Sequence, residues 1–177
     1  NMALQNGEID LIAQLPAAGT DLFAEDDNFV MDSVTSTRTS FLMYNLNTLA
    51  LQDVNVRNAL SMAIDRESFA NVVFKGFADP SYGVYSASLP YGGTEGLDLT
   101  VSSYDPEGAA ELLKEAGYED TDGDGIVDKD GENLSLRFVT YSYNTEFLQF
   151  ADIYQAQLAE IGVDLQVETY DVLDDTM

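Results

Sequence analysis

The chain has 177 residues, of which 45% are hydrophobic, and its 32 acidic and 7 basic side chains give a formal net charge of −25 at pH 7. Affinity for nucleic acids and for anionic membrane surfaces depends on cationic groups, so this charge argues against both as partners. The absence of His and Cys excludes a Ser–His or Cys–His nucleophile, a thiolate metal site and a disulfide framework.

The N-terminal part of the chain is predicted to be rich in strands. Gly7 is typical of the residue that follows a helix end. An apolar run predicts a short buried strand at residues 9–13, and two further strands are predicted at 29–35 and 40–45. The run Phe41 to Tyr44 predicts that the last of these strands is buried on both faces.

A pair of helices is predicted next, because Asp53 and Asp65 are typical capping residues. Apolar side chains predicted to point inward are Val56, Ala59, Leu60, Ala63 and Ile64 on the first helix and Phe69, Val72 and Val73 on the second. Residues 77–103 form a long Gly-, Ser-, Pro- and Tyr-rich region without a clear period, and such loops are usually functional or wrap a neighbour. No apolar run in the chain reaches the ~18 residues that span a bilayer.

The C-terminal part predicts alternating helices and strands. Asp105-Pro106-Glu107 is a strong helix start, and Gly117 ends that helix. A polar loop at 119–132 precedes a strand at 134–140, a long helix that begins at Asn144 or Thr145, and a strand at 163–169. Strand, helix and strand make one βαβ unit. The predicted fold class is α/β, a single domain with a mixed β-sheet flanked by helices.

Four segments resemble parts of one protein family when they are taken together. Residues 53–66 (DVNVRNALSMAIDR) are similar to the helix pair of the family 5 extracellular solute-binding proteins, the receptors of peptide and nickel ABC importers. Residues 105–118 (DPEGAAELLKEAGY) resemble a second motif of that family, and residues 120–126 (DTDGDGI) follow at the usual place. Residues 7–10 (GEID) resemble the segment in which the family's chain passes between its lobes.

The resemblance implies a lobe of the periplasmic-binding-protein type II kind. Residues 1–177 would be a single domain, a truncated second lobe of a two-lobe receptor, with the first lobe and the C-terminal part absent. The implied function is capture of oligopeptides or a related small solute outside the cytoplasmic membrane and delivery to an ABC permease, without catalysis. The implied location is extracytoplasmic, as a cell-surface lipoprotein or in the periplasm, and nickel is less expected because the lobe lacks His.

The candidate ligand-binding residues are Tyr141, Tyr143 and Asn144, where the strand runs into the long helix. Ligands of open α/β sheets collect beyond the carboxyl ends of strands. In some peptide-binding relatives the matching segment carries a ligand-pairing Arg and a Tyr; here Tyr141 stands at the Arg position and Tyr143 at the Tyr position. The alternative is that both rings cap the core edge with their hydroxyls in solvent. Tyr82, Tyr85 and Tyr91 could also line the cleft or merely stabilise their own loop.

Calcium is the one cofactor that the sequence raises. Asp120, Asp122, Asp124 and Asp128 fit positions 1, 3, 5 and 9 of a calcium loop, but Gly131 occupies the closing position where a bidentate Glu is expected. The alternatives are therefore a solvated acidic turn and a calcium site, and the second would make the chain a calcium-dependent extracellular interaction module. Arg57 and Arg66 are predicted to form ion pairs with neighbours such as Asp53, Asp65 or Glu67.

Overall fold

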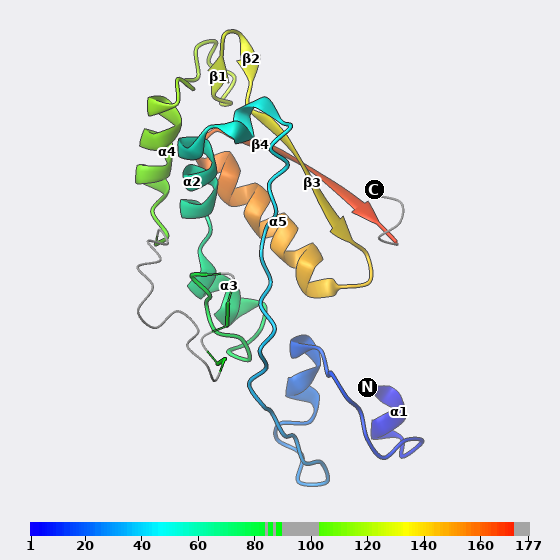
Figure 1. Ribbon diagram of the computed structural model, residues 1–177. Helices are drawn as coiled ribbons and strands as arrows, with labels where there is room; N and C mark the ends of the chain where they lie inside the picture. The colour runs from blue at the N-terminus through cyan, green and yellow to red at the C-terminus, as the bar shows by residue number, and fades with distance from the viewer. Residues whose placement is uncertain (84, 87, 90–102, 172–177) are drawn as a thin grey trace.

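The computed structural model describes residues 1–83, 85, 86, 88, 89 and 103–171 (Figure 1). The predicted Tyr91 lies outside the described residues. The elements in chain order are α1 (Met2–Gln5), η1 (Ala17–Leu22), η2 (Leu49–Gln52), α2 (Val54–Met62), α3 (Arg66–Val72), α4 (Pro106–Glu115), β1 (Asp128–Lys129), β2 (Glu132–Asn133), β3 (Ser135–Tyr141), α5 (Thr145–Glu160) and β4 (Asp164–Tyr170).

The four longer helices begin where the sequence predicts. Each is preceded by a side chain that accepts a hydrogen bond from a first-turn backbone N–H, at donor–acceptor distances of 2.8–3.0 Å. These caps satisfy donors that have no partner inside the helix. The capping residues are Asp53, Asp65, Asp105 and Asn144.

One hydrophobic core joins α2, α4, α5 and the β3–β4 pair. Its largest fully buried side chains include Leu60 of α2, Leu113 of α4 and Leu158 of α5. The buried Tyr154 of α5 donates its hydroxyl hydrogen to the carbonyl oxygen of Leu60 at 3.1 Å, which ties α5 to the end of α2. Helices α2, α4 and α5 and the β3–β4 sheet therefore form one packed unit.

The predicted βαβ unit is confirmed, since β3 and β4 pair in parallel with α5 between them in the chain. Figure 1 shows α5 lying across one face of these strands. Phe138 points toward this helix and packs edge-on against Phe150 and Tyr154. The residues that alternate with Phe138, Arg137 and Val139, therefore lie on the opposite face.

Antiparallel pairing occurs in a second sheet, where β1 pairs with β2 and Glu119 forms an isolated bridge with Asp128. The α/β class is therefore confirmed, with parallel and antiparallel pairs in separate two-stranded sheets among the described residues.

The three strands predicted at 9–13, 29–35 and 40–45 are wrong for the described structure, in which none of these segments is a β-strand. A strand requires a hydrogen-bonded partner, and none of the described strands pairs with these segments. The two segments predicted to be buried, 9–13 and 40–45, are also more exposed than predicted, with Leu11 82% and Met43 85% exposed. Only one face of 40–45 packs on the core, through Leu42 and Tyr44.

Two smaller predictions also fail. Val73 is buried as predicted, but Val72 is 70% exposed. The inward side of α3 carries the buried Ala70 and Val73, and Val72 points away from it because neighbouring residues of a helix are rotated by about 100°. Arg57 and Arg66 form no ion pair with any residue that the structure describes. They donate instead to backbone carbonyls of η2 and the end of α2, at 2.8–3.4 Å, where carbonyl groups lack helical partners.

Candidate functional site

The carboxyl ends of β3 and β4 meet at one edge of the molecule because the two strands are parallel (Figure 1). Tyr141 at the end of β3 lies in register with Tyr170 at the end of β4. The same edge carries the turn at residues 142–144 that leads into α5. Ligands of open α/β sheets gather at such an edge, so it is the candidate functional site.

The two predicted tyrosines are brought together at this edge. The rings of Tyr141 and Tyr143 are stacked, with centroids 5.6 Å apart and planes 18° from parallel. Tyr143 is 65% exposed and Tyr141 is half-buried. The stack therefore presents aromatic surface to solvent where the β3 chain turns away from the sheet.

The turn between the tyrosines is tied to the end of β4. The backbone N–H of Ser142 donates to the carbonyl oxygen of Tyr170 at 3.0 Å. The Ser142 hydroxyl donates to Oδ1 of Asp171 at 2.6 Å. These two bonds fix the position of the turn relative to β4, so the aromatic pair stands on a supported backbone.

The third predicted ligand residue, Asn144, has a structural contact. Its Oδ1 accepts from the backbone N–H of Phe147 at 3.0 Å and so caps α5. Glu146 follows in the first turn, where a carboxylate interacts favourably with the helix dipole. The ligand role of Tyr141, Tyr143 and Asn144 stays a prediction, and the structure places all three at one edge.

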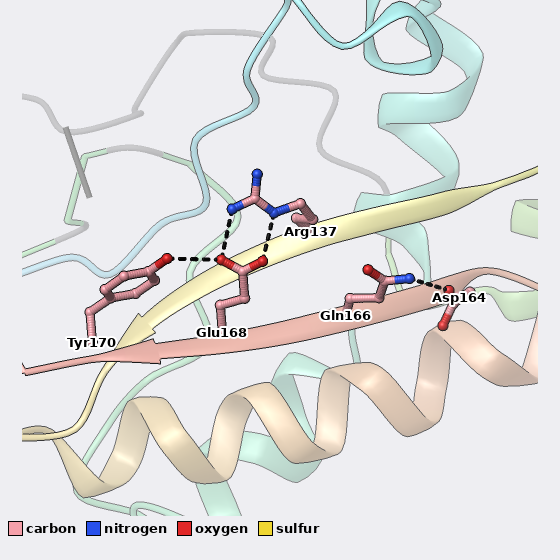
Figure 2. A network of polar contacts seen from close by, with 5 residues as sticks. All are labelled: Arg137, Asp164, Gln166, Glu168 and Tyr170. Carbon is pink, nitrogen blue, oxygen red and sulfur yellow. Dashed lines mark hydrogen bonds and ion pairs between the residues drawn. The ribbon is translucent and has the colours of Figure 1, made fainter. Parts of the chain in front are cut away.

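A polar network lies on the sheet face opposite α5 and extends to this edge (Figure 2). Arg137 donates to both carboxylate oxygens of Glu168, at 2.6 and 2.7 Å. The Tyr170 hydroxyl donates to Oε2 of Glu168 at 3.0 Å. The hydrogen bonds from Arg137 and Tyr170 lower the pKa of Glu168 below its ordinary value, so this carboxylate is held charged.

Sequence reasoning missed Tyr170 and Asp171 as residues of the candidate site. The signal for them was present, because a predicted parallel βαβ unit places the ends of both strands at one edge. The predicted second strand ended near these residues, but their neighbours across the sheet become evident only from the β3–β4 register.

Three of the four predicted calcium ligands lie close together. Carboxylate oxygens of Asp120, Asp122 and Asp124 lie within 4.8 Å of one another, and all three residues are exposed. Asp120 accepts from the backbone N–H groups of Gly123 and Gly125, and Asp124 accepts from that of Ile126. The bond from Ile126 lowers the pKa of Asp124. The carboxylates therefore already shape the loop through backbone amides.

The fourth predicted ligand, Asp128, is not part of this group. It is buried at 6% exposure and accepts from the backbone N–H and the hydroxyl of Thr121 at 2.8–2.9 Å. These bonds anchor the loop to β1. Calcium binding stays a prediction, and its ligand set from the described geometry would be the three exposed aspartates.

Of the tyrosines in the long loop, Tyr82 contacts its own domain. The Tyr82 hydroxyl donates to Glu67 at 3.3 Å, and the Arg66 guanidinium lies 5.6 Å from the Tyr82 ring centroid. Tyr82 therefore holds its loop against α3. Tyr85 is 60% exposed.

Helices of the described residues are all too short or too polar to cross a bilayer.

Comparison with known proteins agrees with this architecture. Residues 1–176 match the family described as bacterial extracellular solute-binding proteins, family 5, middle part. The oligopeptide-binding protein AppA of Bacillus subtilis is 29% identical over 165 residues, which are 93% of this chain and 30% of AppA. The glutathione-binding protein GsiB of Salmonella typhimurium is 31% identical over 170 residues, 95% of this chain and 30% of GsiB.

Solved structures give the same result. The structure of AppA in complex with a nonapeptide superimposes with a TM-score of 0.82 at 30% identity, covering 96% of this chain and 33% of AppA. NikA from Brucella suis in complex with Fe(III)-EDTA gives a TM-score of 0.87 at 26% identity, covering 99% of this chain and 35% of NikA.

The fold is thus that of the periplasmic-binding-protein type II class. The chain belongs to family 5 of the bacterial extracellular solute-binding proteins. It spans about a third of the length of the relatives that it matches. Nothing in these comparisons supports the calcium-dependent interaction module that the sequence left open.

Proposed function

We propose that this chain is part of the substrate-binding component of an ABC importer. It helps to capture an oligopeptide or a related small solute outside the cytoplasmic membrane and to deliver that solute to the permease subunits. In this proposal residues 1–177 form a single domain, the larger part of a second lobe, and the chain catalyses no reaction.

The observation that carries the proposal is the continuous family match over residues 1–176. It is supported by superposition on a peptide-bound relative over 96% of this chain. Receptors of this kind close two lobes around a solute by a hinge motion. The carboxyl edge of β3–β4 supplies one wall of the cleft in our proposal, with Tyr141 and Tyr143 facing the solute.

The location follows from the same role. The family consists of extracellular solute-binding proteins, so we place the chain in the periplasm or on the cell surface. On the cell surface, a lipid anchor would hold the receptor at the membrane. The formal charge of −25 would favour solubility there.

Calorimetry on the polypeptide encoded by the complete gene tests the proposal. The titrants are peptides of two to nine residues, glutathione and nickel–histidine, with hydrolysis of the peptides followed by mass spectrometry. We expect saturable peptide binding with the peptides recovered intact. Cleavage of the peptides, or binding of none of the three titrants, would contradict the proposal.

A pair of variants tests the position of the site. Tyr143→Leu removes an exposed ring of the stack, and Tyr104→Leu removes a partly exposed tyrosine at the start of α4. We expect weaker binding for Tyr143→Leu alone. Equal affinity of both variants would place the solute elsewhere.

A further inference from the structure

The aromatic surface at the carboxyl edge suits a cationic group. The stacked rings of Tyr141 and Tyr143 leave much of Tyr143 exposed. The face of a tyrosine ring attracts a cation through its quadrupole. The edge therefore offers a π surface whose position is fixed by the bonds from Ser142 to Tyr170 and Asp171.

The charges around the edge also favour a cationic group over an anionic one. Arg137 is the only Lys or Arg from residue 130 to residue 177, and its guanidinium is engaged in a two-point pair with Glu168. Glu146 and Asp171 add two further carboxylates close to the strand ends. An anionic solute group at this edge would be repelled by these carboxylates, and residues 130–177 offer it no Lys or Arg other than the paired Arg137.

The N-terminus of α5 lies at the same edge and, taken alone, would favour an anion. That preference is already satisfied by groups of the chain itself. Asn144 accepts from the N–H of Phe147, and Glu146 places its carboxylate in the first turn. The helix end is therefore no obstacle to a cation next to the tyrosines.

The whole chain adds a field of the same sign. Its formal net charge of −25 attracts cationic solutes over distances that depend on ionic strength. This field would increase the rate at which cationic solutes encounter the protein. The tyrosines and Asp171 would then discriminate between cationic and other groups at the edge itself.

We propose that the carboxyl edge of β3–β4 binds a positively charged group of the solute, a Lys or Arg side chain of a peptide. The group lies against the Tyr141–Tyr143 stack and is paired with the carboxylate of Asp171. This inference rests on the proposed receptor function and names the substrate class of that site. It predicts a receptor that prefers basic to acidic peptides of the same length.

A competition experiment on the polypeptide encoded by the complete gene tests the proposal. Equimolar alanine-based peptides of two to nine residues carry one Lys, Gln or Glu at each position in turn, and mass spectrometry quantifies the retained peptides. We expect Lys peptides to be retained over Glu peptides by about fivefold or more at one position. Gln peptides should lie between the two.

Matched variants separate the edge from the general field. Asp171→Asn removes one charge and keeps an oxygen for Ser142, and we expect the Lys-over-Glu ratio to fall by about half or more. Glu111→Gln removes one charge from the exposed surface of α4, and we expect no change in the ratio at physiological salt. Tyr143→Leu should lower the ratio, and Tyr104→Leu should not.

Each outcome has a distinct meaning. Equal retention of Lys, Gln and Glu peptides would overturn the cationic subsite and leave the receptor function intact. Retention of no peptide would overturn the cationic peptide subsite, and it would contradict the receptor function as well if neither glutathione nor nickel–histidine binds in the calorimetry. An equal loss of selectivity in Asp171→Asn and Glu111→Gln would assign the preference to net charge and overturn the role of the edge.

Discussion

Leu113 gives the sharpest test of the packing that holds the candidate edge in place. It is 0% exposed and belongs to the core that joins α4 to α2, α5 and the β3–β4 pair. Leu113→Ala removes the carbon atoms beyond Cβ, and at ~0.8 kcal/mol per carbon the lost burial amounts to about 2.5 kcal/mol. Incomplete collapse of the cavity raises the expected loss of unfolding free energy to about 2.5–5 kcal/mol.

Urea unfolding followed by circular dichroism at 222 nm measures this loss. A chain of this size loses roughly 2–4 °C in Tm per kcal/mol, so we expect Tm to fall by about 5–20 °C. Leu49→Ala is the matched control, because Leu49 is 81% exposed and its loss should stay within about 0.5 kcal/mol. Similar losses for both variants, or a loss below about 1 kcal/mol for Leu113→Ala, would refute the described core.

Three further predictions follow from the described contacts. Asn144→Ala removes the cap of α5 and should lower the unfolding free energy by about 1 kcal/mol in urea titrations, whereas Asn144→Ser should lower it less; equal losses would contradict the capping role. Burial raises the pKa of Tyr154 well above 10.0, so its contribution is complete below about pH 10 and is lost as pH rises further. Tyr154→Phe should therefore give a flatter stability profile from pH 9 to 11 in urea titrations, and an unchanged slope would contradict this. Sodium chloride should raise Tm by screening the acidic loop, and calcium added in high salt should raise it little further. A calcium-specific rise of several degrees, abolished by joint Asp122→Asn and Asp124→Asn replacement, would instead show a metal site.

The helices illustrate what could be predicted from local sequence. Asp53, Asp65, Asp105 and Asn144 each cap the helix that follows them. A cap depends on a side chain and a backbone N–H two or three residues away, so the required information is contiguous in the chain. The βαβ unit was predictable for a related reason, because hydrophobic period distinguishes its helix from its strands.

The segments wrongly predicted as N-terminal strands illustrate what could not be predicted from local sequence. Apolar runs at 9–13, 29–35 and 40–45 have strand composition, yet a strand forms only when another backbone supplies hydrogen bonds along its length. No strand of the described residues pairs with these segments. Composition therefore indicated an extended chain but could not identify a partner for it.

The sequence by itself determined the family, the first residues of the four longer helices, the βαβ unit and the place of Tyr141 and Tyr143 between a strand and a helix. Tertiary structure alone decided that their rings stack, that Tyr170 and Asp171 join them, and that Arg137 is engaged by Glu168, 31 residues away. The physical reason is distance along the chain. Caps and hydrophobic period act within a few residues, whereas the register of β3 with β4 brings together side chains that no local pattern relates.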